Sequence, residues 1–260
     1  MNDSTNLRNL LADWPFDPEH DARIVRDGDG QEVLQVRTPL GIEQMELAGR
    51  PDGARPYGME SALEFHLQRL AGARTAGRRG EFQLSAEDCT ELFGEGTLYY
   101  FRYLRLFQLK RWAETVRDTQ RNLRLFDFVH EHAARDEDRA YLERWRPYIL
   151  RVNTSASALL ALEKGAYARA LEIARTGLER IESLEEMDDE TFALERNRSA
   201  TALRELASQI ERRKPVSRLE ALERQLRQAI ETQEFERAAE LRDHIRELKG
   251  RRAGRPQEPA

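Results

Sequence analysis

Residues 217–249 read SRLEALERQLRQAIETQEFERAAELRDHIRELK, a stretch that predicts two helices joined by a short turn. Its first half places apolar side chains every three or four residues, the spacing of one helix face; they are Leu219, Leu222, Leu226, Ala229 and Ile230. Thr232-Gln-Glu234 should turn the chain. The second half carries another stripe, which uses alanine where the helices must approach closely: Phe235, Ala238, Ala239, Arg242, Ile245 and Leu248. Phe235 is expected to plug the turn end of this hairpin.

A helix break and a cap mark the start of the hairpin. Pro215 should end the preceding helix, because proline cannot continue a helix and restricts the residue before it. Ser217-Arg-Leu-Glu220 then has the form of a capping box, in which the Ser and Glu side chains accept hydrogen bonds from free N–H groups at the helix start. The sequence therefore predicts a boundary here and a helix that begins at about Arg218.

The hairpin is too short to fold strongly alone, because domains below about 40 residues usually need a metal, a disulfide or a partner. Cys89 is the only cysteine of the chain, which excludes an internal disulfide and a CxxC zinc site. We expect no metal and no cofactor. The physical inference is a protein partner, which could be another copy of the chain, one of its own upstream helices or a different protein.

Three short runs give the second half of the hairpin its character: Glu234-Phe-Glu236, Ala238-Ala239 and Leu241-Arg-Asp243. With the apolar positions that flank them, they closely resemble the UVR motif shared by excinuclease subunits B and C. The resemblance implies a coiled-coil-like helical hairpin that pairs with a like hairpin on a partner, joining the two subunits during nucleotide excision repair of DNA in bacteria. The motif also occurs in Clp unfoldases, which act in protein quality control, and in activators of protein-arginine kinases.

The resemblance also implies which residues bind the partner. They are Leu222, Leu226, Ala229, Phe235, Glu236, Ala238, Ala239, Leu241, Arg242, Asp243 and Ile245. Phe235, the two alanines and Leu241 would form the contact surface, and the charged residues its rim. A second reading stays open, in which Arg242 and Asp243 only stabilise the hairpin.

The enzymes that usually carry this motif need features that the sequence lacks. An excinuclease B subunit needs a Gly-x4-Gly-Lys-Ser/Thr phosphate loop, and the kinase activators need paired CxxC zinc ligands, but neither occurs here. An excinuclease C subunit needs a nuclease site, and no catalytic pattern such as Gly-x-Ser-x-Gly or HExxH is present. We expect a protein that is not an enzyme, an adaptor that carries the motif by itself.

The fold class expected for the whole chain is mainly α, with a small β-meander at the N-terminus. Three runs have strand character: Ala22 to Arg26, Glu32 to Thr38 and Gly41 to Leu47. Asp27-Gly-Asp-Gly30 between the first two is a tight-turn sequence, because glycine accepts the positive φ of hairpin turns. A helix marked by apolar residues between Met59 and Leu70 should cover one face of this three-stranded antiparallel sheet.

Helical patterning dominates from Ser85 to Arg213. Ser85-Ala-Glu-Asp88 is an N-cap signal for a short helix, which Gly94 should end. Residues 106–129 and 161–184 resemble each other, since each carries a long helix, a basic turn with an aromatic residue and a second amphipathic helix. A tetratricopeptide-like hairpin is one reading of the second copy, although the offset of 55 residues differs from the period of about 34 in that repeat. We favour generic antiparallel helix pairs.

Shifts of pattern along the chain predict four parts. They are a small α+β domain at residues 1–80, a helical domain at 81–213, the UVR-like hairpin at 217–250 and a disordered tail at 251–260. No apolar run approaches the roughly 20 residues of a membrane span, and the N-terminus lacks the pattern of a secretory signal. A cytoplasmic protein without a membrane contact is therefore expected.

Direct binding of single-stranded nucleic acid is the alternative function. Residues 99–112 interleave aromatic and basic side chains, as single-strand binding surfaces do, and the C-terminal region is basic. On a helix, however, Tyr100 and Tyr103 share one face while Arg102 and Arg105 lie off it, which is the usual pattern of a core helix. The net charge of −5 also argues against a general polyanion binder. We expect nucleic acid to be contacted only indirectly, through the partner.

Overall fold

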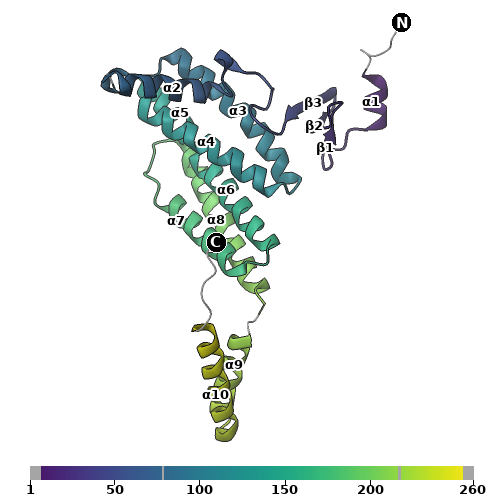
Figure 1. Cartoon of the computed structure of the whole chain (residues 1–260), viewed down its shortest axis with the longest axis vertical. Coiled ribbons are helices and arrows are strands. Elements are labelled where there is room, and N and C mark those ends of the chain that lie inside the picture. Colours follow the sequence, from purple (N-terminus) through teal and green to yellow (C-terminus); the bar gives the residue numbers. More distant parts are fainter. Residues whose placement is uncertain (1–6, 78, 216–217, 254–260) are drawn as a thin grey trace. The chain divides into compact units, whose positions relative to one another are not determined.

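The structure is a computed structural model that describes residues 7–77, 79–215 and 218–253, and the side chains of all of these except 79, 218–220 and 247–253. The chain divides into two compact units, Met1–Glu211 and Arg212–Ala260. Most described residues are helical, and one three-stranded antiparallel sheet lies near the N-terminus (Figure 1). The mainly α fold class is thereby confirmed. The further division expected at residue 80 stays a prediction.

The sheet is the meander that the sequence predicts. Strand β1 (Ala22–Arg26) pairs with β2 (Glu32–Thr38), and β2 pairs with β3 (Gly41–Glu46), both in antiparallel fashion. In the first turn, the Asp27 carboxylate accepts hydrogen bonds from two backbone N–H groups at 2.9 Å each. Gly30 has a φ of 79°, a conformation that glycine adopts without strain. This local network fixes the hairpin and, with it, the strand register.

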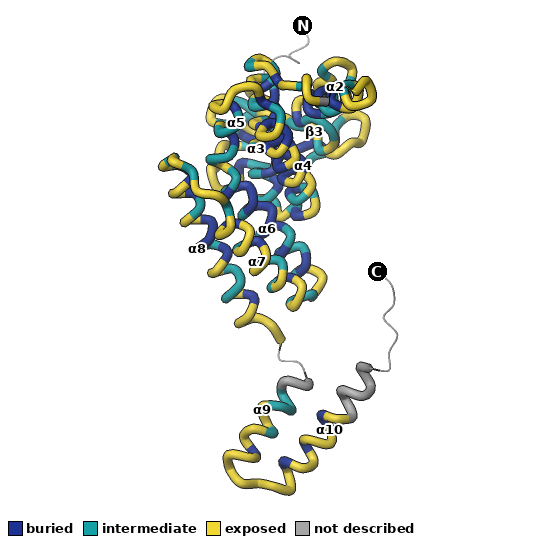
Figure 2. The backbone as a smooth tube through the Cα atoms, turned by 90° about the vertical axis from the view of Figure 1, so that its left-hand side faces the viewer, coloured by how far each residue is buried: buried dark blue, intermediate teal, exposed yellow. Residues whose placement is uncertain are grey.

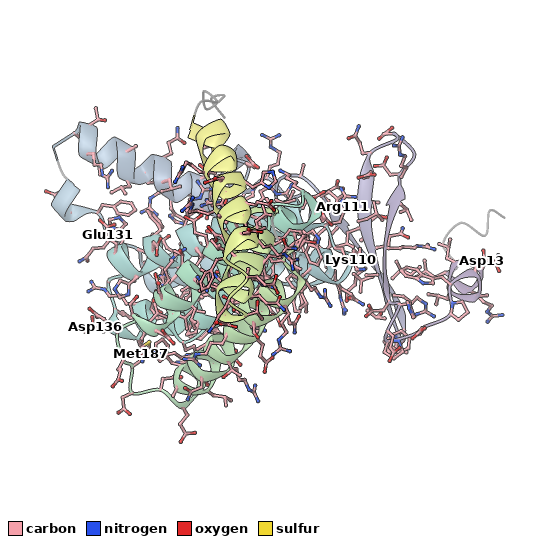
Figure 3. The ribbon with its side chains drawn as sticks, turned by 90° about the horizontal axis from the view of Figure 1, so that it is seen from below. Asp13, Lys110, Arg111, Glu131, Asp136 and Met187 are labelled. Carbon is pink, nitrogen blue, oxygen red and sulfur yellow. The ribbon has the colours of Figure 1, made fainter. Side chains whose placement is uncertain are left out.

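Both faces of the sheet are covered. Val33 and Leu34 point to opposite faces because successive strand residues alternate, yet both are almost fully buried. Helix α1 (Arg8–Asp13) lies on one side of the sheet and the helical body on the other (Figure 3). Arg117 of the body donates a hydrogen bond to the carbonyl of Leu47 at 2.6 Å, directly after the last strand. The sheet is therefore fastened to the helices by side chains that reach its backbone.

Helix α2 (Ala62–Thr75) does not cover the strands as the sequence predicts. It packs on α3 (Ala86–Gln108), away from the sheet, and its apolar residues belong to the core cluster of that helix (Figure 1). The position of α2 is set by hydrogen bonds to a residue that is distant in the sequence. The buried carboxylate of Glu95 on α3 accepts hydrogen bonds from the first N–H groups of α2, those of Ala62 and Leu63, at 2.7 and 3.1 Å.

The helical body confirms the expected helix pairs. Its members are α3, α4 (Trp112–His132), α5 (Asp136–Glu143), α6 (Arg146–Glu163), α7 (Tyr167–Glu182) and α8 (Glu190–Arg213). Helix α3 packs on α4, α4 on α6 and α6 on α7, and the buried residues concentrate on these contacts (Figure 2). Short 3-10 turns precede α2 and α3, at Pro56–Gly58 and Arg79–Glu81. The short α5 lies in the chain between the hairpins α3–α4 and α6–α7. It accounts for part of the 55-residue offset between the two similar segments.

Helix α3 does not end at Gly94, contrary to the prediction, but continues to Gln108. Its start is as expected, because Ser85 and Asp88 form a reciprocal capping box. Glycine ends a helix when it adopts a left-handed conformation, and Gly94 has no positive φ. The residues that follow, such as Tyr99 and Tyr103, are buried against the body, and this packing continues the helix through the glycine.

In the described part of the chain, three helical hairpins share one turn geometry: α3–α4, α6–α7 and, near the C-terminus, α9 (Arg218–Glu231) with α10 (Phe235–Ala253). Each turn has one residue with a left-handed φ of 59° to 68°, namely Lys110, Gly165 and Gln233. The N–H of this residue donates to the carbonyl three residues back, and the next N–H donates to the carbonyl five residues back. This pair of bonds is a Schellman motif, which satisfies carbonyls at the end of the first helix.

The second helix of each hairpin also begins in the same way. An aromatic residue stands first, and a small buried residue follows three positions later on the side that faces the first helix. The aromatic residues are Trp112, Tyr167 and Phe235, and the small ones are Thr115, Ala170 and Ala238. The similarity seen in the sequence between residues 106–129 and 161–184 therefore extends to the C-terminal hairpin.

A buried ion pair joins α3, α4 and the end of the sheet. The guanidinium of Arg102 donates two hydrogen bonds to the carboxylate of Asp118 on α4, at 2.6 and 2.9 Å, and both side chains are only 1% exposed. Its remaining nitrogen donates to the carbonyls of Glu46 and Gly49, at 2.7 and 2.9 Å. Arg102 thus donates hydrogen bonds to α4, to the end of β3 and to the loop that follows β3.

His66 makes part of the stability of the body depend on pH. Its ring is fully buried, with Nδ1 2.9 Å from the Arg69 guanidinium and Nε2 3.5 Å from a Glu91 carboxylate oxygen. Burial lowers the pKa of His66, and this outweighs the attraction of Asp88 and Glu91 for its protonated form. The unfolded chain therefore takes up the proton at a higher pH, about 6.5, than the folded chain.

We expect the stability that the neutral His66 ring contributes to be complete above about pH 6.5 and to fall as the pH is lowered below that value. The variant His66→Gln cannot titrate. Urea unfolding at pH 7.5 and at pH 5.5 should show a smaller stability difference between wild type and variant at the lower pH. A difference that is the same at both pH values would contradict this role of His66.

Candidate functional site: the C-terminal hairpin

The C-terminal unit consists of α9 and α10, and its turn at residues 232–234 is confirmed. Helix α10 continues to Ala253, three residues into the segment 251–260 for which a disordered tail was expected. The rest of that segment lies outside the described residues. The same holds for Ser217 and for the side chains of Leu219, Glu220 and Leu248, so the predicted capping box and two stripe positions stay predictions.

Six of the eleven expected binding residues form the inner seam of the hairpin. Leu222, Leu226 and Ala229 of α9 pack against Ala238 and Leu241 of α10, and Ile245 is buried further along α10. The alanines let the two helices approach closely, as the sequence predicts. Within this chain Ala238 and Leu241 are buried against α9, and their contact with a partner stays a prediction.

The other five expected residues are exposed: Phe235, Glu236, Ala239, Arg242 and Asp243. Phe235 is 70% exposed and does not plug the turn. It is the first residue of α10, directly after the left-handed turn, and this position directs its ring away from the seam. Ile230, at the end of α9, is 55% exposed as well. Sequence reasoning placed Ile230 in the buried stripe and missed this exposure, because Ala229 beside it takes the buried position.

The charged residues of the hairpin form short surface pairs. Arg242 Nε lies 3.3 Å from Asp243 Oδ1, and Arg237 lies 3.1 Å from Glu234. All four side chains are about half exposed or more. Exposed pairs of this kind contribute between zero and about 1 kcal/mol. The reading in which Arg242 and Asp243 only stabilise the hairpin therefore gives them a small role.

The other two hairpins show what covers the aromatic residue at the start of a second helix. Trp112 is 9% exposed, and its indole N–H donates to the Glu163 carboxylate on α6, a helix of the next hairpin, at 2.7 Å. Tyr167 is half-buried and packs against a cluster of buried residues that includes Ile210 of α8. In both hairpins a third helix contributes to the cover. Phe235 stands at the same position and is exposed.

Three of the four basic side chains between residues 99 and 112 pair with acidic groups of the protein. Arg102 is buried in its ion pair with Asp118. Arg105 lies 3.0 Å from the Asp21 carboxylate, and Arg111 pairs with Glu114 and Glu32. These three side chains are therefore engaged within the protein. Lys110 is exposed, and the alternative function, which also rests on the basic C-terminal region, stays a prediction.

The C-terminal unit is thus a two-helix hairpin with a packed inner seam and two exposed apolar residues, Ile230 and Phe235, near its turn. In agreement, residues 217–251 match the UVR family, described as the UvrB/uvrC motif. The chain thus carries a UVR motif near its C-terminus, and this indicates a role in protein–protein interaction or in DNA repair. Comparison with curated proteins gave no match, and comparison with solved structures gave none either.

Within the described part of the chain, no helix combines the length and the apolar character that crossing a bilayer requires.

Proposed function

We propose that the chain is a non-catalytic cytoplasmic adaptor that binds a protein partner through the tip surface of its UVR hairpin, defined as Ile230, Phe235 and Ala239. The observation that carries this proposal is the 70% exposure of Phe235 at a position that is buried or half-buried in the other two hairpins. Ala239 is one helical turn further along α10 and is also exposed. A small residue there leaves room for an incoming helix next to the ring.

The energy available at the tip surface is sufficient for a specific contact. Complete burial of a phenylalanine side chain contributes about 1.5–3 kcal/mol. Every 1.4 kcal/mol corresponds to a factor of about ten in affinity. Aromatic anchors at the centre of an interface commonly dominate its binding energy. Phe235 alone should therefore account for roughly a tenfold to hundredfold difference in affinity.

The match to the UVR family supports a partner with a like hairpin, in nucleotide excision repair or in Clp-type protein quality control. The partner is either a different protein or a second copy of this chain. The repair link is an analogy from the shared module, since a shared fold does not determine function. The helical body would then connect the bound partner to whatever else the adaptor contacts.

Phe235→Asp tests the proposal. Aspartate is favourable in the first turn of a helix, where it faces the positive end of the helix dipole, so the hairpin should stay folded. We expect the variant to lose at least one protein that the tagged wild type captures from cells, by a factor of about ten or more. If the partner is a second copy, the molar mass in solution should instead fall from that of a dimer to that of a monomer.

Phe101→Asp is the matched control, because Phe101 is also exposed but lies on α3 of the body. Its capture pattern and its mass should equal those of the wild type. A protein whose loss is specific to Phe235→Asp should then be purified and its affinity measured directly. An unchanged set of captured proteins together with an unchanged mass would refute the proposal.

A further inference from the structure

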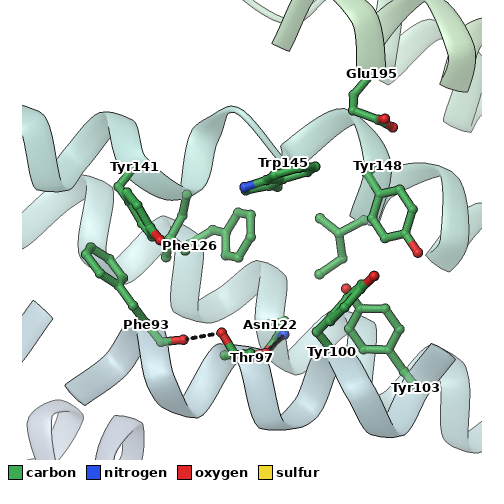
Figure 4. A pocket seen from close by; sticks show the side chains of 13 residues that line it. Phe93, Thr97, Tyr100, Tyr103, Asn122, Phe126, Tyr141, Trp145, Tyr148 and Glu195 are labelled. Carbon is green, nitrogen blue, oxygen red and sulfur yellow. Dashed lines mark hydrogen bonds between the residues drawn. The ribbon is translucent and has the colours of Figure 1, made fainter. Parts of the chain in front are cut away.

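The helical body contains a pocket that is separate from the hairpin and rich in aromatic residues. It has a volume of about 460 Å³, within the range of small-molecule sites, and lies among helices α3 to α6 with one residue from α8 (Figure 4). Seven of its thirteen lining residues are aromatic. Trp145 and Tyr141 are 44% and 47% exposed, which places the mouth of the pocket on their side.

Three tyrosines form one end of the pocket. Tyr100 meets Tyr103 edge to face, with ring centroids 5.6 Å apart, and Tyr148 at a tilt, with centroids 6.1 Å apart. Burial raises the pKa of Tyr148 to about 12 and places the pKa of Tyr103 well above its ordinary value. The phenols of Tyr103 and Tyr148 therefore stay neutral near pH 7. They offer π faces and hydroxyl groups to a ligand and contribute no charge.

Glu195 is the only charged residue among the described residues that line the pocket. It comes from α8, is 8% exposed, and its carboxylate lies at the Trp145 and Tyr148 end (Figure 4). Arg198 reaches the Oε1 atom at 3.4 Å, but the buried Oε2 atom has no hydrogen-bond partner. A buried polar atom left unpaired costs about 1–3 kcal/mol and more when it is charged. Glu195, a lining residue of the pocket, thus carries a buried acceptor atom that lacks a donor.

Cations already contact the rings of this pocket from outside it. The Arg144 guanidinium lies over the Tyr141 ring at 5.6 Å, and the Arg151 guanidinium lies over the Tyr148 ring at 4.9 Å. Neither arginine lines the pocket. A phosphate or carboxylate ligand would therefore find no basic side chain among the described lining residues, and it would face the Glu195 carboxylate. This argues against nucleotides and acidic ligands.

We propose that this pocket binds a compact organic cation, a substituted ammonium or guanidinium group, between the aromatic rings and the Glu195 carboxylate. The ring faces attract a cation within about 6 Å of their centroids, and Trp145 provides the strongest such face. The carboxylate supplies the counter-charge, and an N–H or N-methyl group of the ligand lies against Oε2. This inference does not depend on the function of the hairpin.

A pair of probes with the same shape separates charge from apolar fit. Choline carries a quaternary ammonium group, and 3,3-dimethylbutan-1-ol replaces its nitrogen by carbon. In calorimetric titrations of the full chain, we expect choline to bind about tenfold more tightly than the neutral alcohol. Methylguanidinium, titrated in the same way, shows whether a planar guanidinium group is preferred to the ammonium group.

Two variants assign the binding to the pocket. Glu195→Gln keeps the shape of the side chain. It should lower the affinity for choline about tenfold and leave the affinity for the alcohol unchanged. Trp145→Leu removes a partly exposed π face and should lower the affinity for both cations. The chain should stay folded, which circular dichroism would verify. The matched control Glu205→Gln changes an exposed glutamate of the same helix and should have no effect.

Equal affinity for choline and the alcohol would overturn the proposal, since the pocket would then recognise only shape. Failure of the folded wild type to bind either cation at millimolar concentration would overturn it as well. So would binding that is unaffected by Glu195→Gln.

Discussion

Asp118→Ala should lower the free energy of unfolding by about 3–5 kcal/mol, because it leaves the buried guanidinium of Arg102 without its counter-charge. Both side chains are 1% exposed, so water cannot replace the lost carboxylate. Loss of the Asp118 carboxylate should also weaken the attachment of the sheet to the body. The same Arg102 side chain donates hydrogen bonds to the carbonyls of Glu46 and Gly49. Urea unfolding followed by circular dichroism measures the effect.

Asp127→Ala is the control for this experiment. Asp127 lies on the same helix and also pairs with an arginine, Arg146, at 2.8 Å, but its side chain is 68% exposed. Solvent screens such a pair, and its removal should cost less than about 1 kcal/mol. If the two variants were equally stable, the buried pair would not have the role that its geometry indicates.

Gly177→Ala should destabilise the protein by about 1–3 kcal/mol, although alanine favours a helix more than glycine does. Gly177 is buried on α7, where it faces Thr154 of α6. A Cβ atom at this position would lie 2.8 Å from the Thr154 Cβ atom and still closer to its Oγ1 and Cγ2 atoms. Rotation of the threonine side chain cannot relieve the contact with its Cβ, so helices α6 and α7 must separate.

Two further variants isolate the cause. Gly94→Ala places the same substitution in α3, where no heavy atom lies within 4 Å of the new Cβ, and it should stabilise the protein by about 0.5–1 kcal/mol. Thr154→Ala removes two of the three clashing atoms and should recover part of the loss in the double variant, a coupling that a double-mutant cycle measures. Thermal unfolding in which Gly177→Ala equals the wild type would contradict the close approach of the two helices.

The sequence was sufficient for features that depend on local patterns. The three strands, the N-cap at Ser85 and the turn at residues 232–234 follow from alternation, capping chemistry and helical periodicity within short windows. The UVR resemblance was equally local. Each of these predictions needed only residues that are neighbours in the chain.

The predictions that proved wrong concern contacts between residues that are distant in the sequence. Gly94 looked like a helix end because packing of the later part of α3 is invisible in a short window. The position of α2 depends on a carboxylate 33 residues away, that of Glu95. The aromatic pocket also escaped prediction, since its walls come from residues between 93 and 195 and only the tertiary fold brings them together.

The turn shared by the three hairpins has a consequence for how the proposed partner would bind the C-terminal hairpin. Within the body, the helix that begins with Trp112 is stacked against α6, so that the indole lies between layers. The C-terminal hairpin has the same turn, and its second helix also begins with an aromatic residue, but no third helix in the described part of the C-terminal unit covers that residue. If the adaptor function proposed above holds, a partner helix would contact Phe235 as α6 contacts Trp112 through Glu163, and it would add a third helix to the hairpin.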